Sequence, residues 1–410
     1  MRGSRPVMMD TEASVSVAHT VLVPKERGRE TRVALVPTVV PALAEAGWHV
    51  LVEPGAGIAA GYPDEAFLAH GAEIDAAGER RADVVVGVRV AGASEEPLAL
   101  ERRLRPGTTM VGIADASEAP DAIRSIAAAG LTLYALELLP RITRAQSMDV
   151  LSSQSTVTGY KAAVLAADTL PKMFPMLTTA AGTVPPAEVL VVGAGVAGLT
   201  AIATARRLGA VVQGYDVRPA AQEEVESLGA RAVVLPLEPA DAEDRSGYAR
   251  DLGAAFERRQ RELLARIVAG IDVVIMAAAI PGRRAPVLLT ADGVARMGPG
   301  SLVVDCAAPR GGNCALTQPD RRVVTPGGVT ILGPTNLPAT IPREASQMFA
   351  KNLASFLTSA IRDPSAPPDL DDPIVAGCLV TRGGTVVHRA IRGLLEARSS
   401  EEGGPDVASA

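Results

Sequence analysis

Short runs of apolar residues alternate along the chain with longer stretches in which apolar residues recur at helical spacing. Pro37–Ala46 is typical of the longer stretches, because a proline opens the expected helix and Gly47 follows its end. Strands that alternate with helices predict a parallel sheet covered on both faces. In the first third, strands are expected at Thr20–Pro24, Trp48–Glu53, Ala82–Val90, Thr108–Asp115 and Leu131–Leu139, and further helices at Pro63–Ala69 and Asp121–Ala129.

The same alternation returns after residue 188, and an apolar stripe in Arg343–Ile361 predicts a long helix that returns the chain to the first domain. We therefore expect an α/β fold with two Rossmann-like domains on parallel sheets, joined by long helices, with a cleft between them. The first domain would span residues 19–155, completed by 345–390, and the second 156–344. Residues 1–18 and 399–410 would be disordered tails. In the second domain, strands are expected at Val189–Val192, Ala210–Tyr215, Arg231–Leu235, Asp272–Ala278, Ser301–Asp305 and Val329–Gly333, helices at Ala220–Leu228 and Asp251–Gly270, and a polar loop at Glu238–Arg250.

A glycine pattern of the form GxGxxG lies between the first strand and first helix of the second domain. Gly193 allows a tight turn, Gly195 lets the backbone approach a pyrophosphate, and Gly198 lets helix and strand pack closely. With 39 glycines in the chain, the bare pattern arises by chance about 0.35 times. Its context is far more specific, because a strand precedes it, a helix N-terminus follows and an acid ends the next strand. These residues predict a dinucleotide site.

Asp216, the acid at the end of that next strand, indicates which dinucleotide is bound. Its carboxylate can accept hydrogen bonds from ribose hydroxyls, whereas a 2′-phosphate would meet a negative charge. This favours NAD(H). The nearby Arg218 can pair with a 2′-phosphate, so on these residues alone NADP(H) stays an alternative.

A polar segment, Pro140–Tyr160, separates an apolar strand from the helical stretch Lys161–Leu170. It offers a cation, an amide, a carboxylate and a hydroxyl within 12 residues. A solvated loop explains such a segment adequately, whereas a loop that leads into an interdomain helix is also a natural wall for a ligand cleft. The four side chains are Arg141, Gln146, Asp149 and Ser152.

Composition excludes several classes of function. The net charge of −6 and the absence of a basic block argue against a nucleic-acid partner. Three cysteines and four scattered histidines form neither a disulfide framework nor a metal-binding pair, so we expect reduced thiols, no metal and a cytoplasmic protein. The longest weakly polar run, Val189–Ala205, contains the glycine pattern and is better explained as strand, turn and helix than as a membrane insertion.

Several motifs together resemble one family, from about Thr20 to His388. The chain resembles the soluble NAD(H)-binding components of proton-translocating nicotinamide nucleotide transhydrogenases, within the wider alanine dehydrogenase/transhydrogenase family. The motifs that carry the resemblance are RITRAQSMDVLSSQS (Arg141–Ser155), GTVPPAEVLVVGAGVAGL (Gly182–Leu199), Gly247-Tyr248-Ala249, Ile280-Pro281-Gly282, Gly311-Gly312-Asn313-Cys314 and LDDPIVAG (Leu370–Gly377).

The resemblance implies a set of site residues and partners. The polar segment would hold the nicotinamide and its ribose, and Tyr248 would lie on a mobile loop that closes over the nucleotide. It also implies direct hydride transfer to NADP(H) on a partner subunit, a separate membrane-spanning subunit that couples proton translocation, and a homodimer that exchanges the hairpin expected in Phe174–Pro186. The chain would then be peripheral to the inner membrane through its partners. The implied site residues are Arg141, Gln146, Asp149, Ser152 and Tyr248 for catalysis, and Gly193, Gly195, Val196, Gly198, Asp216, Val217, Arg218, Gly247, Gln260 and Ala279 for the cofactor.

The chain departs from the alanine dehydrogenase branch where that branch binds and protonates pyruvate. Its Asp, Lys and His correspond here to Pro309, Arg89 and the Ala114-Asp115 region, so that chemistry is expected to be absent. Hydride transfer between two nicotinamides needs no proton acceptor, whereas oxidation of an amino acid does. Two alternatives stay open. One is a stand-alone amino or imino acid dehydrogenase, in which Arg310 binds a carboxylate. The other is an NAD-sensing regulatory subunit.

Overall fold

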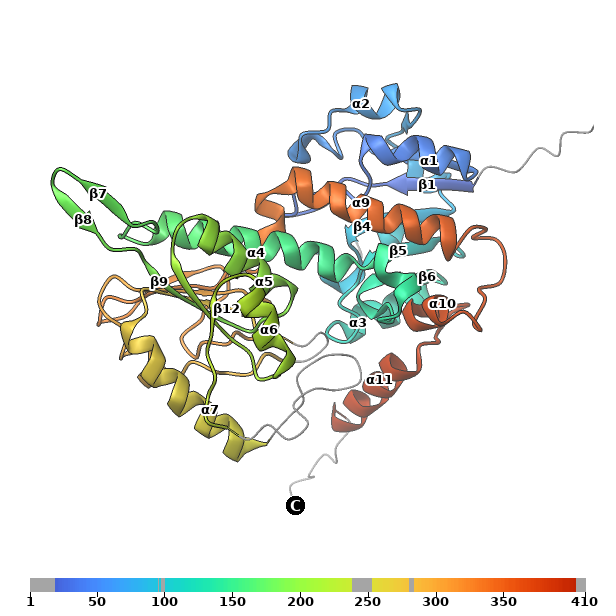
Figure 1. Ribbon diagram of the computed structural model, residues 1–410. Helices are drawn as coiled ribbons and strands as arrows, with labels where there is room; N and C mark the ends of the chain where they lie inside the picture. Colours follow the sequence, from blue (N-terminus) through green and yellow to red (C-terminus); the bar gives the residue numbers. More distant parts are fainter. Residues whose placement is uncertain (1–18, 95, 97–99, 238–252, 280–283, 403–410) are drawn as a thin grey trace, which may run out of the picture.

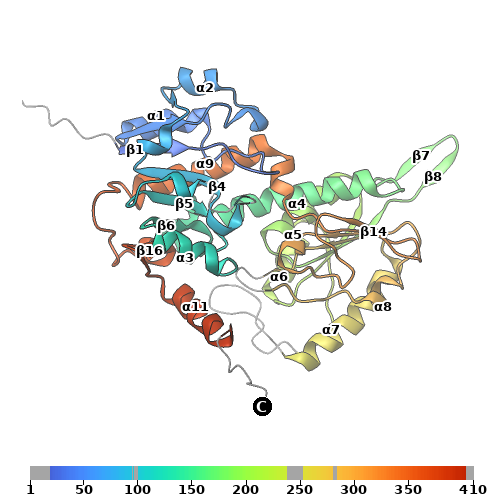
Figure 2. The same cartoon turned by 180° about the vertical axis from the view of Figure 1, so that it is seen from behind.

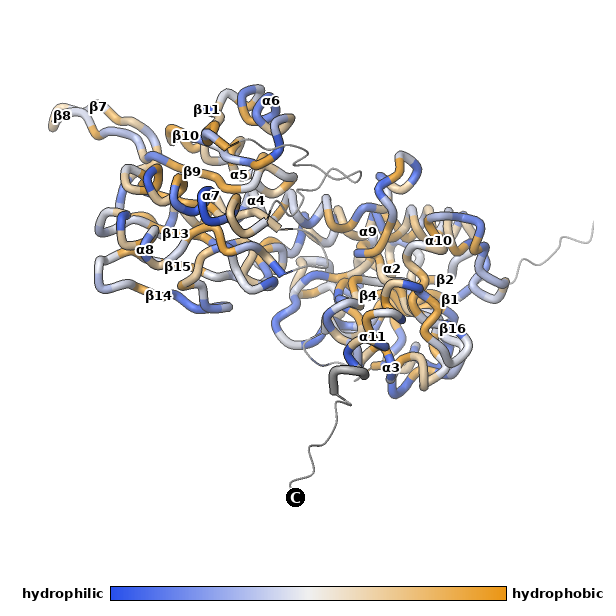
Figure 3. Tube along the Cα trace, turned by 90° about the horizontal axis from the view of Figure 1, so that it is seen from below, coloured by the Kyte–Doolittle hydropathy of each residue, from blue (hydrophilic) through white to orange (hydrophobic). Residues whose placement is uncertain are grey.

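The computed structural model describes residues 19–94, 96, 100–237, 253–279 and 284–402. Two units, each built on its own sheet, lie side by side, and the long helix α4 (Val150–Thr169) reaches from one into the other (Figure 1). Apolar residues concentrate on the strands, whereas much of α7 (Ala254–Ile267) is hydrophilic (Figure 3). The expected α/β class with two domains is confirmed. No helix of the described residues is long and apolar enough to cross a membrane.

The first sheet has eight strands within the described residues, in the order β17-β16-β6-β5-β4-β1-β2-β3. The strands β1 to β6 pair in parallel, and their central members are buried along nearly their whole length, as expected for a sheet covered on both faces. The strands are β1 (His19–Val23), β2 (Trp48–Val52), β3 (Glu73–Ile74), β4 (Val84–Arg89), β5 (Thr109–Ile113), β6 (Thr132–Ala135), β16 (Leu379–Arg382) and β17 (Thr385–Val386), and the helices α1 (Val40–Glu45), α2 (Asp64–Ala69), α3 (Pro120–Ala128), α10 (Pro373–Cys378) and α11 (Arg389–Glu402).

Late residues complete this first unit. The helix α9 (Pro342–Ser359) buries Phe349, Leu353 and Phe356 in the first core, within one to two residues of its expected bounds. The strand β16 then pairs antiparallel with β6, so the sheet is not purely parallel. The sequence did not predict this strand, because a four-residue run before a turn carries little periodicity.

The helix α11 extends to Glu402 and so includes the start of the expected disordered tail 399–410. Residues 1–18 and 403–410 lie outside the described residues.

The second sheet has, in the described residues, the order β11-β10-β9-β12-β13-β15-β14, parallel except for the edge strand β14. The chain leaves β9 towards one edge and returns through β12 towards the other. Ligands of such sheets bind outside the carboxyl ends of the strands at this switch point, which here lies between β9 and β12. The strands are β9 (Glu188–Val192), β10 (Val211–Tyr215), β11 (Arg231–Ala232), β12 (Val273–Met276), β13 (Leu302–Asp305), β14 (Arg322–Val324) and β15 (Thr330–Leu332), and the remaining helices α5 (Val196–Arg207), α6 (Ala220–Ser227) and α8 (Ala291–Val294).

The polar segment 140–160 is not the loop that the sequence predicts. A short 3-10 helix, Thr143–Met148, leads into α4, which begins at Val150. Serines and threonines are poor signals for a helix interior, because their side chains compete for the backbone. Here they bond within the helix, since the Thr156 and Thr158 hydroxyls each donate to the carbonyl four residues earlier (3.0 Å). Packing against α5 stabilises the rest of the helix, so tertiary contact overrides local propensity.

A two-stranded hairpin follows α4, as the sequence allowed. The strands β7 (Leu177–Thr179) and β8 (Gly182–Val184) pair antiparallel, and all six of their residues are exposed. The hairpin projects away from both sheets in opposite views (Figures 1 and 2). Its flanks also expose apolar side chains, including Met173 and Met176.

Candidate functional site

Gly193 forms the turn at the carboxyl end of β9. Its φ is +94°, a conformation that L side chains rarely adopt. A Cβ here would lie 2.7 Å from the backbone carbon of Ala277 and from the backbone nitrogen of Ala278, at the end of β12. Only glycine therefore allows β9 and β12 to converge at the switch point.

The other two glycines have different roles. The sequence suggested that Gly198 lets helix and strand pack closely. A Cβ on Gly198 would lie 1.7 Å from the Gly193 carbonyl oxygen, so the closest contact is instead between the helix and the turn. A Cβ on Gly195 would meet nothing within 4 Å. Gly195 precedes Val196, the half-exposed first residue of α5, so open space lies against free N–H groups of a helix N-terminus. A pyrophosphate fits this space, and the turn is consistent with a bound dinucleotide.

Asp216 connects β10 to the glycine turn. One carboxylate oxygen accepts a hydrogen bond from the Ala194 amide (2.8 Å), and the other from the backbone amide and Nε of Arg218 (2.9 and 3.0 Å). Val217, between Asp216 and Arg218 in the sequence, is half-buried. The Arg218 guanidinium also donates to the Ala194 carbonyl (3.3 Å). Because its charge is paired with Asp216, Arg218 favours a 2′-phosphate less than its position in the sequence suggested.

The predicted polar residues lie around the start of α4. Asp149 is the N-cap of this helix, and its carboxylate accepts hydrogen bonds from the Ser152 amide (2.9 Å) and hydroxyl (2.6 Å). Arg141 and Gln146 are exposed in the segment that leads into the helix. The structure thus joins Asp149 to Ser152 directly and leaves the other two side chains at the surface.

Close packing between α4 and α5 connects the two parts of the site. A Cβ on Gly159 of α4 would lie 2.0 Å from the carbonyl oxygen of Ala197, in the first turn of α5. Ser152 lies seven residues before Gly159, or about 10 Å along the helix axis. The helix that carries Ser152 therefore packs, about two turns further on, against the helix that follows the glycine turn.

Four further predicted residues have separate locations. Gln260 of α7 is buried, and its amide donates to the Tyr215 hydroxyl (2.7 Å), so it supports the end of β10 from inside the core. Burial raises the pKa of Tyr215 to about 12, which keeps that hydroxyl protonated. Ala279 is exposed just beyond the end of β12. Gly247 and Tyr248, together with the Ile280–Gly282 motif, lie outside the described residues.

The sequence singled out Gly311–Cys314 but not the buried groups that explain this motif. The Asp305 carboxylate accepts hydrogen bonds from the Asn313 and Cys314 amides (2.8 and 2.9 Å). The Asn313 amide side chain in turn exchanges hydrogen bonds with the backbone of Ala278 (2.8 and 3.1 Å). The motif therefore fixes the carboxyl end of β12 beside the glycine turn. The sequence did contain a signal for Asp305, because this acidic residue ends an apolar run that forms a buried strand.

An ion-pair cluster joins the loops at the carboxyl ends of both sheets. Arg310, after β13, pairs with Asp115 (3.3 Å) and Glu118 (3.2 Å), after β5. Arg89 lies 4.0 Å from the other oxygen of Asp115. The half-buried Glu137 carboxyl holds the loop by accepting hydrogen bonds from the backbone amides on either side of Asp115, and desolvation raises its pKa. Arg310 is thus occupied by carboxylates of the chain itself.

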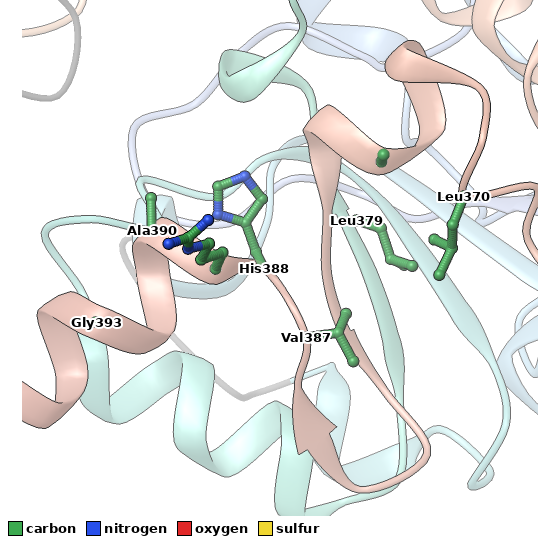
Figure 4. Close-up of a pocket in the computed structure, with 8 residues that line it drawn as sticks. Leu370, Leu379, Val387, His388, Ala390 and Gly393 are labelled. Carbon is green, nitrogen blue, oxygen red and sulfur yellow. The ribbon is translucent and has the colours of Figure 1, made fainter.

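A hollow of about 610 Å³ lies away from these groups, between β16, α10 and α11 (Figure 4). Its walls are mainly apolar, from Leu370, Leu379 and Val387. His388 also lines the hollow, and its Nε2 lies 3.1 Å from the Gly377 carbonyl oxygen. Among the predicted site residues that the structure describes, none lines this hollow.

Two family models together match nearly the whole chain. The model described as alanine dehydrogenase/PNT, N-terminal domain, matches residues 22–158, and the model described as alanine dehydrogenase/PNT, C-terminal domain, matches residues 162–389. The chain belongs to the alanine dehydrogenase/PNT family. The glycine turn and Asp216 lie in the match to the C-terminal domain, whereas the polar residues at the start of α4 lie in the match to the N-terminal domain.

Within the alanine dehydrogenase/PNT family, the chain is more similar to transhydrogenase subunits than to alanine dehydrogenases. It is 43% identical to an NAD(P) transhydrogenase alpha-subunit chain of Rhodospirillum rubrum, over 91% of this chain and 99% of the relative. It is 27% identical to alanine dehydrogenase of Bacillus subtilis, over 90% and 93%. The crystal structure of a transhydrogenase from Sinorhizobium meliloti matches with a TM-score of 0.78 at 41% identity, over 91% of this chain and all of that chain. An L-alanine dehydrogenase structure gives 0.75 at 25% identity, over 92% and 99%.

These relationships confirm the predicted family, its oxidoreductase character and its cofactor. The two domains are those of a family that binds NAD(H), and the chain is related to a component of an NAD(P) transhydrogenase. The relatives' designation as alpha subunits implies further subunits in their assemblies.

Proposed function

We propose that this chain is the NAD(H)-binding component of an NAD(P) transhydrogenase, and that hydride passes directly between its NAD(H) and NADP(H) bound on a partner subunit. A separate membrane-spanning subunit would couple this transfer to proton translocation. The chain itself would be cytoplasmic and attached to the inner membrane through these partners. The observation that carries the proposal is the open glycine turn at Gly195, packed through α5 against α4, the helix that Asp149 caps.

The residues of the chain would divide the work of binding and orientation. The backbone at Gly193, Gly195 and Gly198 and the N-terminus of α5 would bind the pyrophosphate. Asp216 would accept hydrogen bonds from the adenosine ribose. NAD(H), when bound, supplies or receives a hydride at its nicotinamide ring. The remaining contacts would come from Arg141, Gln146, Asp149 and Ser152 at the nicotinamide, from Val196, Val217, Arg218, Gly247, Gln260 and Ala279 around the nucleotide, and from Tyr248 as a closing residue.

Hydride transfer between two nicotinamides requires orientation and exclusion of water but no proton acceptor. The four histidines of the chain fit this requirement, because all of them bond within the first unit: His19 to Asp363, His49 to Glu73, His70 to the Ala66 carbonyl and His388 to the Gly377 carbonyl. They would not serve as a general base beside the glycine turn.

A stand-alone amino or imino acid dehydrogenase is the second candidate, because the chain resembles alanine dehydrogenases over nine-tenths of its length. The ion pairs of Arg310 weigh against it. A cation that binds a substrate carboxylate must be free to do so, whereas Arg310 is paired with both Asp115 and Glu118.

The decisive assay mixes the purified chain with an NADP(H)-binding transhydrogenase component, NADPH and an oxidised NAD analogue whose reduced form absorbs separately. We expect rapid reduction that requires both proteins. The chain alone should then be tested with NAD⁺ and a panel of amino acids. Failure of the two-protein reaction, with NADH binding demonstrated, would refute the proposal, and amino acid oxidation by the chain alone would establish the second candidate.

A homodimer is proposed on the hairpin β7–β8. Met176, directly before β7, is 62% exposed and Val184 of β8 is 38% exposed, where the hairpin projects from its own subunit. Apolar side chains gathered on a projecting element are typical of an interaction surface. Their occupant would be a second copy of the chain, since two projecting hairpins can be exchanged symmetrically.

The dimer is tested with the double variant Met176→Glu/Val184→Glu. Two buried charges without partners cost several times the thermal energy, so the variant is expected to sediment as a monomer while the unmodified chain sediments as a dimer. Ile58→Glu is the matched control, because Ile58 is 64% exposed on the first unit, away from the hairpin. Monomeric sedimentation of the unmodified chain would disprove the dimer.

A further inference from the structure

A buried ion pair lies where the first sheet meets the helices that connect it to the second. Glu30 and Arg32 belong to the loop after β1, and their side chains are 3% and 4% exposed. The guanidinium binds the carboxylate through Nε (2.7 Å) and Nη2 (2.6 Å). This bidentate geometry fixes the plane of the guanidinium as well as its position.

The third nitrogen of Arg32 extends the pair to α4. Its Nη1 donates to the side-chain oxygen of Gln154 (2.7 Å), and the Gln154 amide nitrogen donates to the Ala345 carbonyl of α9 (3.0 Å). Asn336, in the segment between β15 and α9, donates to Glu30 (2.9 Å). Segments separated by more than 100 residues in the sequence thus meet on one guanidinium.

Gln154 lies close to the candidate site. It follows Ser152 by two residues, or about 3 Å along the axis of α4, and is buried against α9. A hydrophobic residue of similar size would fill the same space without the cost of burying a charged pair, and buried ion pairs contribute little net stability compared with such replacements. A gain in stability therefore explains this buried network poorly. Its hydrogen bonds explain it better as a means of fixing the position of α4 relative to the first sheet.

We propose that Arg32 and Gln154 are positioning residues for hydride transfer, which fix the first turns of α4 relative to the first sheet. Asp149 and Ser152 lie in those turns, so their placement beside the nicotinamide depends on this network. The inference rests on the proposed function. The glycine turn is held separately, by β9, β12 and Asp216, so NADH affinity depends much less on the network than the rate of transfer does.

The test replaces Gln154 with Met, which keeps the length of the side chain but removes both hydrogen bonds. With the partner component present, the hydride-transfer rate is expected to fall at least tenfold, whereas the Kd for NADH changes less than threefold. Gln154→Glu retains an acceptor for Arg32 and is expected to recover most of the rate. Gln213→Met is the matched control, because it removes an Arg–Gln hydrogen bond (to Arg231, 2.9 Å) that does not touch α4.

Two results would overturn the inference. One is an unchanged transfer rate in Gln154→Met, and the other is a loss of rate and NADH affinity in parallel with the folded fraction, which would indicate a purely structural role. The fluorescence of bound NADH gives a readout that needs no transfer. If the unmodified chain proves inactive with the partner component, the proposed function fails. A shifted emission in Gln154→Met would still support the positioning role, and an unchanged emission would refute it.

Discussion

Gly195→Ala is expected to raise the Kd for NADH at least tenfold and to leave the fold intact. The backbone at Gly195 is extended, with φ −79° and ψ −170°, so alanine adopts it without strain. The new methyl meets no protein atom within 4 Å and occupies the space that a pyrophosphate would fill. The free energy of unfolding should change by less than about 1 kcal/mol, the usual range for an N-cap change. Isothermal titration with NADH and urea unfolding measure the two effects.

Gly198→Ala provides the contrast. Its methyl would lie 1.7 Å from the Gly193 carbonyl oxygen, so the turn must move and the unfolding free energy should fall by about 1–3 kcal/mol, as in other overpacked sites. Loss of binding in this variant would come with loss of stability. Wild-type NADH affinity in Gly195→Ala would show that the pyrophosphate does not lie against this turn.

The pH dependence of stability is expected to change strongly in Glu26→Gln. The Glu26 carboxyl accepts a hydrogen bond from the Val88 amide (2.6 Å). Burial first, and then the nearby negative charge of Glu30, raise its pKa to about 8, against the opposing charge of Arg32. Between pH 4.5 and 8 the native state therefore holds a proton that the unfolded state has lost, and stability falls as the pH rises through this window.

Glutamine keeps the hydrogen-bond acceptor and removes the ionisation, so the variant should lack this part of the decline. One pKa unit corresponds to about 1.4 kcal/mol. Because part of Glu26 reaches solvent, we expect a gain of about 2 kcal/mol over the unmodified chain at pH 8.5, with little difference at pH 5. Urea unfolding at both pH values measures it. Glu45→Gln, an exposed carboxyl on α1, is the control. Parallel pH profiles of the unmodified chain and Glu26→Gln would contradict the expectation.

The sequence predicted what local patterns encode. The turn at Gly193 and the acid at Asp216 were found because their roles depend on residues within about 25 positions, and most strands of both sheets were found from continuous apolar runs. The start of α4 was missed because its serines and threonines favour a loop unless the helix is packed, as it is here against α5 and α9.

The remaining misses depend on contacts between distant parts of the chain. Arg32 reaches Gln154 across 122 positions, and Arg310 reaches Asp115 across 195. Nothing near either arginine in the sequence specifies its partner. The sequence instead left Arg310 available to a substrate, whereas the folded chain neutralises it.

The late strand β16 has a consequence for how the protein emerges from the ribosome. The second sheet consists of consecutive strands between residues 188 and 332, so it can close as soon as that stretch has been synthesised. The first sheet still lacks β16 at that time, and the core that receives Phe349 and Phe356 of α9 stays open. Domains usually fold in N-terminal order during synthesis. In this chain we instead expect the second unit to close first, and the first unit to keep apolar surface exposed until the residues up to Arg382 have been synthesised.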